Sequence, residues 1–243
     1  MSARQPRRVL AFLLAALASL VAAGMLPTPA QASMAAWIDQ IGTYDYLTSP
    51  NYDGLAPVSS VITDQTLGLG TFDRLDGELV MVGGIAYRVG TDGTPRPITS
   101  TATTPFFETI DFAPDWSGPV APGTTCVNLL SAVNTLAQTA TGVVAVRVRG
   151  TFSDLVTRSV PAQSTPYPPL AEAVAKQTVF QLGSRKAVLV GFRTGADFAG
   201  IGAPGLHLHG ITADRTAGGH VLSCVAGGDV QLSVQRAAGF RVS

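Results

Sequence analysis

PGLHLHGITADRTAGGHVLSC, residues 204–224, predicts a β-hairpin that carries all three histidines of the chain. The first half of this stretch reads as a strand, and side chains alternate along a strand, so His207 and His209 would project from the same face. Asp214–Gly219 is rich in turn-forming residues, so His220 would begin the returning strand. The hairpin therefore brings three imidazoles toward one point.

These three histidines are a candidate metal site. They lie within 14 residues of one another in a chain of 243, and histidine is the commonest metal ligand in proteins. Three neutral imidazoles with one open coordination position are typical of a catalytic zinc. The alternative is a hairpin whose histidines are ordinary surface or core residues.

The composition of the whole chain favours strands and turns around a sizeable core. Hydrophobic residues make up 46% and charged residues 13%, which excludes a disordered chain. The 26 glycines and 16 prolines favour turns and strands over long helices. The formal net charge is zero, so no basic field is present to attract nucleic acid.

Short helices are expected between the strands. The pattern of apolar and turn residues predicts helices at Ala35–Ile41, from Thr124 or Thr125 through Leu136, and from Pro168. It predicts strands at Glu78–Val82 and Ile85–Val89 joined by a Gly83-Gly84 turn, at Thr104–Phe112, and from Val143 to Arg149.

Residues 1–32 read as a signal peptide. Three arginines precede an apolar run, and Ala30-Gln31-Ala32 supplies the small residues of a cleavage site. The alternative is an N-terminal membrane anchor, since the apolar run is long. Cleavage would leave 13 basic and 16 acidic residues, and we expect an exported protein that does not associate with a membrane afterwards.

Cys126 and Cys224 are the two cysteines of the chain. In an exported protein they can form a disulfide, and two buried free thiols are the alternative. No Cys-x-x-Cys pair occurs, so neither a redox motif nor a thiolate zinc site is present.

Three blocks of the sequence resemble the signatures of the acetolactate decarboxylases. The first is Gly68–Leu79 (GLGTFDRLDGEL), and the second is Thr157–Gln163 (TRSVPAQ). The third comprises Pro204–His209 (PGLHLH) and Asp214–Leu222 (DRTAGGHVL). Their order and spacing are similar to those of the family.

The resemblance implies an α+β fold with two domains. Residues 33–141 would form an N-terminal mixed β-sheet with helices, and residues 142–243 a C-terminal β-barrel-like domain that carries the metal. Members of the family form homodimers and convert 2-acetolactate, a small 2-hydroxy-3-oxo acid, to acetoin and carbon dioxide. Their zinc is held by three histidines, which here would be His207, His209 and His220.

The resemblance also assigns roles to three further residues. Arg158 matches an active-site arginine that holds the carboxylate, although by itself it reads as a surface ion pair. Glu78 matches an acid beside the zinc that would deliver a proton, although by itself it reads as a solvated hairpin carboxylate. Thr71 matches a polar residue near the substrate. Lys176 and Lys186 fall outside the three blocks, so a lysine Schiff base is not expected.

Some positions depart from the family pattern. Gly210 stands where a bulky aromatic residue is usual, and Ser223 where an aspartate is expected. Family members also continue into a segment that brings a second glutamate to the zinc, whereas here Asp229 is the one acid after His220. Asp229 follows a Gly-Gly turn and is expected to face solvent. We therefore expect weak activity that depends on Glu78. The alternatives are a catalytically impaired relative that keeps the zinc, or another zinc lyase.

Overall fold

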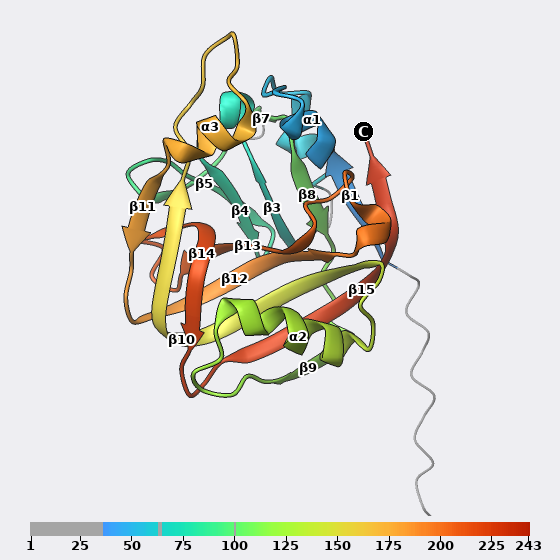
Figure 1. The fold of residues 1–243 in the computed structure, drawn as a ribbon, viewed down its shortest axis with the longest axis vertical. Coiled ribbons are helices and arrows are strands. Elements are labelled where there is room, and N and C mark those ends of the chain that lie inside the picture. Colours follow the sequence, from blue (N-terminus) through green and yellow to red (C-terminus); the bar gives the residue numbers. More distant parts are fainter. Residues whose placement is uncertain (1–35, 63–64, 100) are drawn as a thin grey trace, which may run out of the picture. The chain divides into compact units, whose positions relative to one another are not determined.

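A computed structural model describes residues 36–62, 65–99 and 101–243, which are mostly β-strand (Figure 1). The described residues belong to one compact unit. No helix among them is long and apolar enough to cross a membrane. The predicted signal peptide at residues 1–32 lies outside the described residues.

The described strands form one large sheet and one short strand pair. The large sheet has the order β12-β13-β14-β10-β15-β1-β8-β3-β4-β5-β6, with β11 and β9 attached to β10 and β15. The strands are β1 (Ala36–Ile41), β2 (Ala56–Pro57), β3 (Leu67–Thr71), β4 (Glu78–Val82), β5 (Ile85–Val89), β6 (Pro95–Pro97), β7 (Thr103–Thr104), β8 (Phe107–Ile110), β9 (Trp116–Pro119), β10 (Val143–Ser159), β11 (Thr178–Gln181), β12 (Arg185–Thr194), β13 (Gly205–Thr212), β14 (Gly218–Ala226) and β15 (Gln231–Val242). The helices are α1 (Tyr44–Thr48), α2 (Cys126–Ala137) and α3 (Leu170–Ala175), with 3-10 turns at Val58–Ser60, Asp73–Leu75 and Ala196–Phe198.

A small closed barrel forms around the long strand β10. The first part of β10 pairs with β12 on one side and β15 on the other, and its last part pairs with β14. Because β12 also pairs with β13, and β13 with β14, the four strands β10, β12, β13 and β14 close on themselves. Valine at alternate positions from Val144 to Val148 is buried in the core beneath α2, as expected for a strand with one face inward.

The first strand, β1, corrects one prediction. The sequence predicted a helix at Ala35–Ile41, but Ala36–Ile41 is a strand. The spacing of Ile38 and Ile41 fits a helix as well as a strand, so the local pattern is ambiguous. The decisive contacts are distant: β1 pairs in parallel with β15 and antiparallel with β8.

Most of the other predicted elements are confirmed. The hairpin of β4 and β5 is present, and α2 begins after Thr125, whose side chain accepts a hydrogen bond from the Asn128 backbone N–H. The sheet is mixed, since β1 and β15 are parallel while its other pairs are antiparallel. The helices are few and short, so the fold is mostly β. The two-domain layout is not confirmed, because one sheet path joins the strands before and after residue 142.

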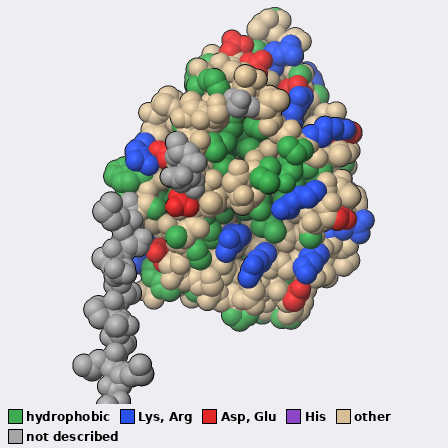
Figure 2. All heavy atoms as spheres, turned by 180° about the vertical axis from the view of Figure 1, so that it is seen from behind, with side chains coloured by type: hydrophobic (Ala, Val, Ile, Leu, Met, Phe, Trp, Pro, Cys, Tyr) green, Lys and Arg blue, Asp and Glu red, His purple; other side chains and the backbone are tan. Residues whose placement is uncertain are grey.

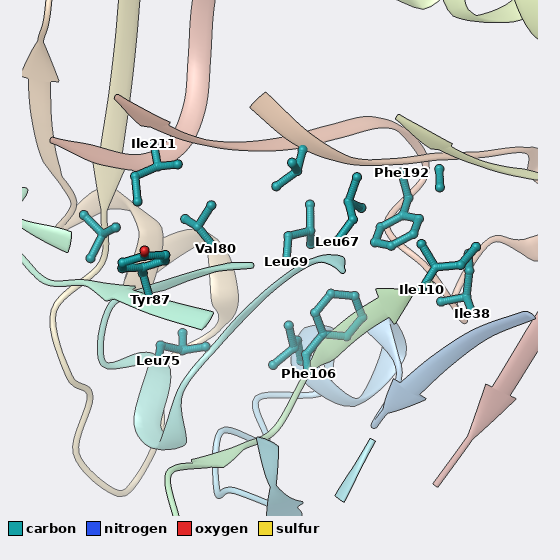
Figure 3. Packing of buried hydrophobic residues seen from close by; sticks show 14 of the residues in the cluster. Ile38, Leu67, Leu69, Leu75, Val80, Tyr87, Phe106, Ile110, Phe192 and Ile211 are labelled. Carbon is teal, nitrogen blue, oxygen red and sulfur yellow. The ribbon is translucent and has the colours of Figure 1, made fainter. Parts of the chain in front are cut away.

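A hydrophobic core lies between the N-terminal strands and the barrel. Figure 3 shows Leu69 and Val80 from the N-terminal strands facing Phe192 and Ile211 from barrel strands. Phe106, 2% exposed, belongs to this core and immediately precedes β8. This core holds β4, which carries Glu78, against β13, which carries two of the histidines.

The disulfide, which the sequence left open, is formed between Cys126 and Cys224. It links the first residue of α2 to β14, the strand that carries His220. The sulfur atoms are 2.04 Å apart, and no free cysteine remains in the described chain.

On the face shown in Figure 2, basic, acidic and hydrophobic side chains are all exposed, and several lysine and arginine side chains lie near one another in its lower half.

Candidate metal centre

The three histidines converge as the hairpin predicts. His207 and His209 lie two residues apart on β13, and His209 is the cross-strand partner of His220 on β14. His220 Nδ1 lies 3.2 Å from His207 Nε2 and 3.3 Å from His209 Nε2. One nitrogen from each ring therefore points at a common centre.

The spacing of these nitrogens fits a tetrahedral metal ion. A zinc ion holds imidazole nitrogen at about 2.0–2.1 Å, so two nitrogens of a tetrahedral site are separated by about 3.3 Å. The two separations in the structure, 3.2 and 3.3 Å, match that distance.

A backbone carbonyl selects the tautomer of His209. Its Nδ1 lies 2.7 Å from the carbonyl oxygen of Leu79, and only a protonated Nδ1 can donate to that oxygen. The Nε2 of the neutral ring then keeps its lone pair for a metal, which is the usual outer-shell support of a histidine ligand. Leu79 belongs to the first signature block, but a role for its carbonyl cannot be read from its side chain.

The surroundings keep the imidazoles neutral. Burial, followed by the positive charge of Arg158, lowers the pKa of His207 to about 3. Burial also lowers the pKa values of His209 and His220 well below the ordinary value, and the nearby His207 and Arg158 add to this effect. Neutral imidazole is the form that binds a metal.

Glu78 and Arg158 lie together beside the histidines. Arg158 Nη1 donates to Glu78 Oε1 at 2.9 Å, and Glu78 Oε2 is 3.4 Å from His209 Nε2. The Glu78 side chain is 6% exposed and that of Arg158 is 13% exposed. Burial raises the pKa of Glu78, although Arg158 and a backbone hydrogen bond from Val160 oppose the shift. Both residues are thus inside the site, and neither is the surface charge that its side chain alone suggests.

Thr71 lies at the same site with its hydroxyl already engaged. Its Oγ1 donates to the carbonyl oxygen of Gly77 at 2.8 Å. That bond anchors the turn immediately before Glu78. The oxygen can still accept a hydrogen bond, but its own proton is committed.

A cavity of about 310 Å³ opens onto the three histidines. Its polar lining includes the three histidines and Arg158, and Glu78 is the one carboxylate among the described lining residues. The remaining wall is largely apolar and comes mainly from α1, α3, Phe106 just before β8, and the segment that leads into β13. The lining consists of Tyr44, Leu47, Gly70, Thr71, Leu75, Glu78, Phe106, Arg158, Val160, Leu170, Val174, Ala203, Pro204, Leu206, His207, His209 and His220.

Sequence reasoning did not find the apolar wall of this cavity. Tyr44, Phe106 and Leu170 come from three distant segments, and each has the appearance of an ordinary core residue. These residues can be assigned to the cavity only from the structure, in which they lie close together. The residues expected to stay outside do so: Lys176 and Lys186 are exposed, and Asp229 is an exposed residue that accepts a hydrogen bond from the Thr151 backbone N–H at 2.7 Å.

Comparison with known proteins gives concordant matches. The profile of the family described as Alpha-acetolactate decarboxylase matches residues 38–243. The alpha-acetolactate decarboxylase of Methanosarcina mazei is 39% identical over 196 residues, which cover 80% of this chain and 68% of the relative. That of Bacillus subtilis strain 168 is 35% identical over 188 residues, covering 77% of this chain and 74% of the relative.

Solved structures agree with these matches. The crystal structure of acetolactate decarboxylase from Bacillus subtilis subspecies spizizenii has a TM-score of 0.81 at 32% identity, covering 85% of this chain and 89% of that one. A Staphylococcus aureus protein of unknown function, described as similar to alpha-acetolactate decarboxylase, has a TM-score of 0.80 at 25% identity, with 84% and 88% of the two chains covered. The region matched by the profile contains every residue of the histidine cavity.

Proposed function

The chain belongs to the alpha-acetolactate decarboxylase family, and from that premise we propose that it converts 2-acetolactate to acetoin and carbon dioxide with a zinc ion held by His207, His209 and His220. The observation that carries the proposal is the convergence of three neutral imidazoles at tetrahedral spacing beside a buried Glu78–Arg158 pair. When bound, zinc supplies a Lewis acid that accepts electron density from the substrate oxygens.

Arg158 is suited to hold the substrate carboxylate. Its guanidinium is nearly buried and lines the cavity, and a charge-assisted hydrogen bond is strong where water is excluded. Loss of carbon dioxide breaks the bond between C1 and C2 and leaves its electron pair on C2, conjugated with the C3 ketone. Arg158 would orient the carboxylate so that the electron pair left on C2 is delocalised onto the C3 ketone.

Glu78 is suited to deliver the proton that completes acetoin. The electron pair on C2 needs one proton, and Glu78 is the acid that lines the cavity. Burial favours its protonated form, since it raises the pKa of the carboxyl. One proton taken up at C2 for each carbon dioxide released balances the reaction, and Glu78 is then reprotonated from solvent.

The test is the release of acetoin and carbon dioxide from racemic 2-acetolactate by zinc-loaded protein. We expect turnover that stops on chelation and returns with added zinc. His209→Ala should lose both stoichiometric zinc and activity. Lys176→Ala, a change at an exposed residue outside the cavity, is the matched control and should keep both. Zinc binding without acetoin would instead identify a catalytically impaired relative, whereas full turnover by metal-free protein would remove the zinc from the proposal.

We also propose that the protein is exported and cleaved before Ser33. The Cys126–Cys224 disulfide supports this, because disulfides persist mainly in oxidising compartments. Mass spectrometry of the protein from the native host gives the test: we expect a mature N-terminus at Ser33 outside the cytoplasm. Intact Met1 on cytoplasmic protein would contradict it.

A further inference from the structure

A second group of buried polar side chains lies outside the histidine cavity. Gln40 on β1, Glu108 on β8 and Thr194 on β12 are 0%, 1% and 3% exposed. Gln40 Oε1, both carboxylate oxygens of Glu108 and Thr194 Oγ1 have no hydrogen-bond partner among the described residues. A buried polar atom left without a partner costs about 1–3 kcal/mol, and more when it is charged.

Oxygens of Glu108 and Thr194 meet at Gly202, and Gln40 lies beside Glu108 on the neighbouring strand. Gln40 and Glu108 are cross-strand partners in the pairing of β1 with β8. A Cβ atom built on Gly202 would be 2.8 Å from Glu108 Oε1 and also 2.8 Å from Thr194 Oγ1. These two oxygens, which come from different strands, therefore both lie against the backbone of residue 202, where no side chain separates them.

Gln40 brings an acceptor but no free donor to this group. Both hydrogens of the Gln40 amide are directed elsewhere, since Nε2 donates to the carbonyl oxygens of Gly42 and Ile201. The charged residues next in sequence are also engaged: Asp39 pairs with Arg241, and Arg193 donates to backbone carbonyls between Thr139 and Gly142. No opposite charge within the described chain is placed to neutralise Glu108.

We propose that Gln40, Glu108 and Thr194 form a second metal site, which takes a hard monovalent cation of the Na⁺ class. Carboxylate, amide and hydroxyl oxygens are ligands for hard cations, whereas the histidine site offers nitrogen. One carboxylate supplies one negative charge, so a monovalent ion leaves the buried site neutral. A Mg²⁺ ion, which demands octahedral geometry and retains several waters, is disfavoured among residues so deeply buried.

The site is placed to support the histidine cavity without belonging to it. Thr194 ends β12, and Gly202 precedes Ala203 and Pro204, which line that cavity. The Ile201 carbonyl is held by Gln40. A bound cation would therefore fasten the connection between β12 and β13 to β1 and β8. This inference does not depend on the reaction proposed above.

Thermal unfolding of the zinc-loaded full chain tests the proposal. Burial raises the pKa of Glu108 to about 8, so the measurement is made at pH 8.5, where the carboxyl can ionise. Unfolding temperatures are compared in choline chloride, NaCl and CaCl₂ at equal ionic strength. A ligand at 100 times its Kd raises the unfolding temperature of a chain of this size by roughly 5 °C or more, and we expect a saturable rise of that order with Na⁺ over choline.

Two variants and one control make the result specific. Glu108→Gln removes the charge at the same size, and Thr194→Val removes one oxygen, so each should lose the response to Na⁺. His207→Ala should weaken zinc binding but keep the Na⁺ response. Equal unfolding temperatures of the wild type in choline chloride and NaCl would overturn the proposal. A full Na⁺ response in Glu108→Gln would also overturn it, and Thr194→Val serves the same purpose where Glu108→Gln does not fold. A larger shift with Ca²⁺ than with Na⁺ would overturn the monovalent assignment.

Discussion

Replacement of Glu108 by glutamine should make the protein more stable in cation-free buffer, and increasingly so as the pH rises. Glu108 is 1% exposed, and burial alone raises its pKa from 4.5 to about 8. Between these pH values the folded protein binds a proton at Glu108 that the unfolded chain releases. Stability therefore falls as the pH rises through this window. Glutamine has a similar shape and stays neutral, so it does not carry this cost.

The size of the effect follows from the two pKa values. One pKa unit corresponds to about 1.4 kcal/mol, so the stability difference between Glu108→Gln and wild type should grow from about 1 kcal/mol at pH 5 to about 3 kcal/mol at pH 7. It should level off above pH 8. The shape of this curve distinguishes titration from a change in packing, because a packing effect does not vary with pH.

Urea denaturation in choline buffers gives the measurement. Wild type and Glu108→Gln are unfolded at pH 5, 6, 7 and 8, and their free energies of unfolding are compared at each pH. Thr109→Val, a change at the neighbouring buried residue of β8, controls for disturbance of the strand. A stability difference that stays constant between pH 5 and pH 8 would refute the assignment of a buried carboxyl with a raised pKa.

Three further outcomes are expected. Glu78→Gln should lower kcat by about 10²–10⁴-fold and reduce the chiral purity of the acetoin formed; unchanged rate and purity would show that another group supplies the proton. Arg158→Lys keeps the charge but loses the planar fork, so kcat/KM should fall by about 10–100-fold; an unchanged kcat/KM would remove Arg158 from the site. Loss of the Cys126–Cys224 bridge in a double serine variant should cost about 4–5 kcal/mol, because the bridge closes a loop with a sequence separation of 98; unfolding at the wild-type urea concentration would contradict the chain-entropy argument.

The histidine hairpin could be predicted from the sequence because its information is local. The two strands and their turn are contiguous, and alternation along one strand puts His207 and His209 on one face. Glu78 and Arg158 come from strands far apart in the chain, and only the family resemblance brought them together. Their own residue types suggested solvent-exposed charges, whereas the structure buries both.

The features that the sequence did not predict depend on contacts between residues far apart in the chain. Ala36–Ile41 has an ambiguous apolar spacing, and pairing with β15 and β8 decides it. Glu108 could not be singled out from the sequence, because the lack of a hydrogen-bond partner for its carboxylate is visible only in three dimensions. Gly210, which departs from the family pattern, also has a spatial explanation: a Cβ there would lie 2.7 Å from Leu189 Cδ2. The side chain of Leu189 therefore occupies the space that a larger residue at position 210 would need.

The position of β15 bears on the order in which the molecule can assemble. This strand follows all the other described strands along the chain, yet it lies between β10 and β1 in the middle of the sheet. Until Gln231–Val242 is available, β1 lacks its parallel neighbour and β10 keeps an unpaired edge, both open to pairing with other chains. Contacts between such distant segments also close slowly. The sheet can therefore be completed only once β15 has been synthesised, and the partly folded chain must be kept from aggregating until then.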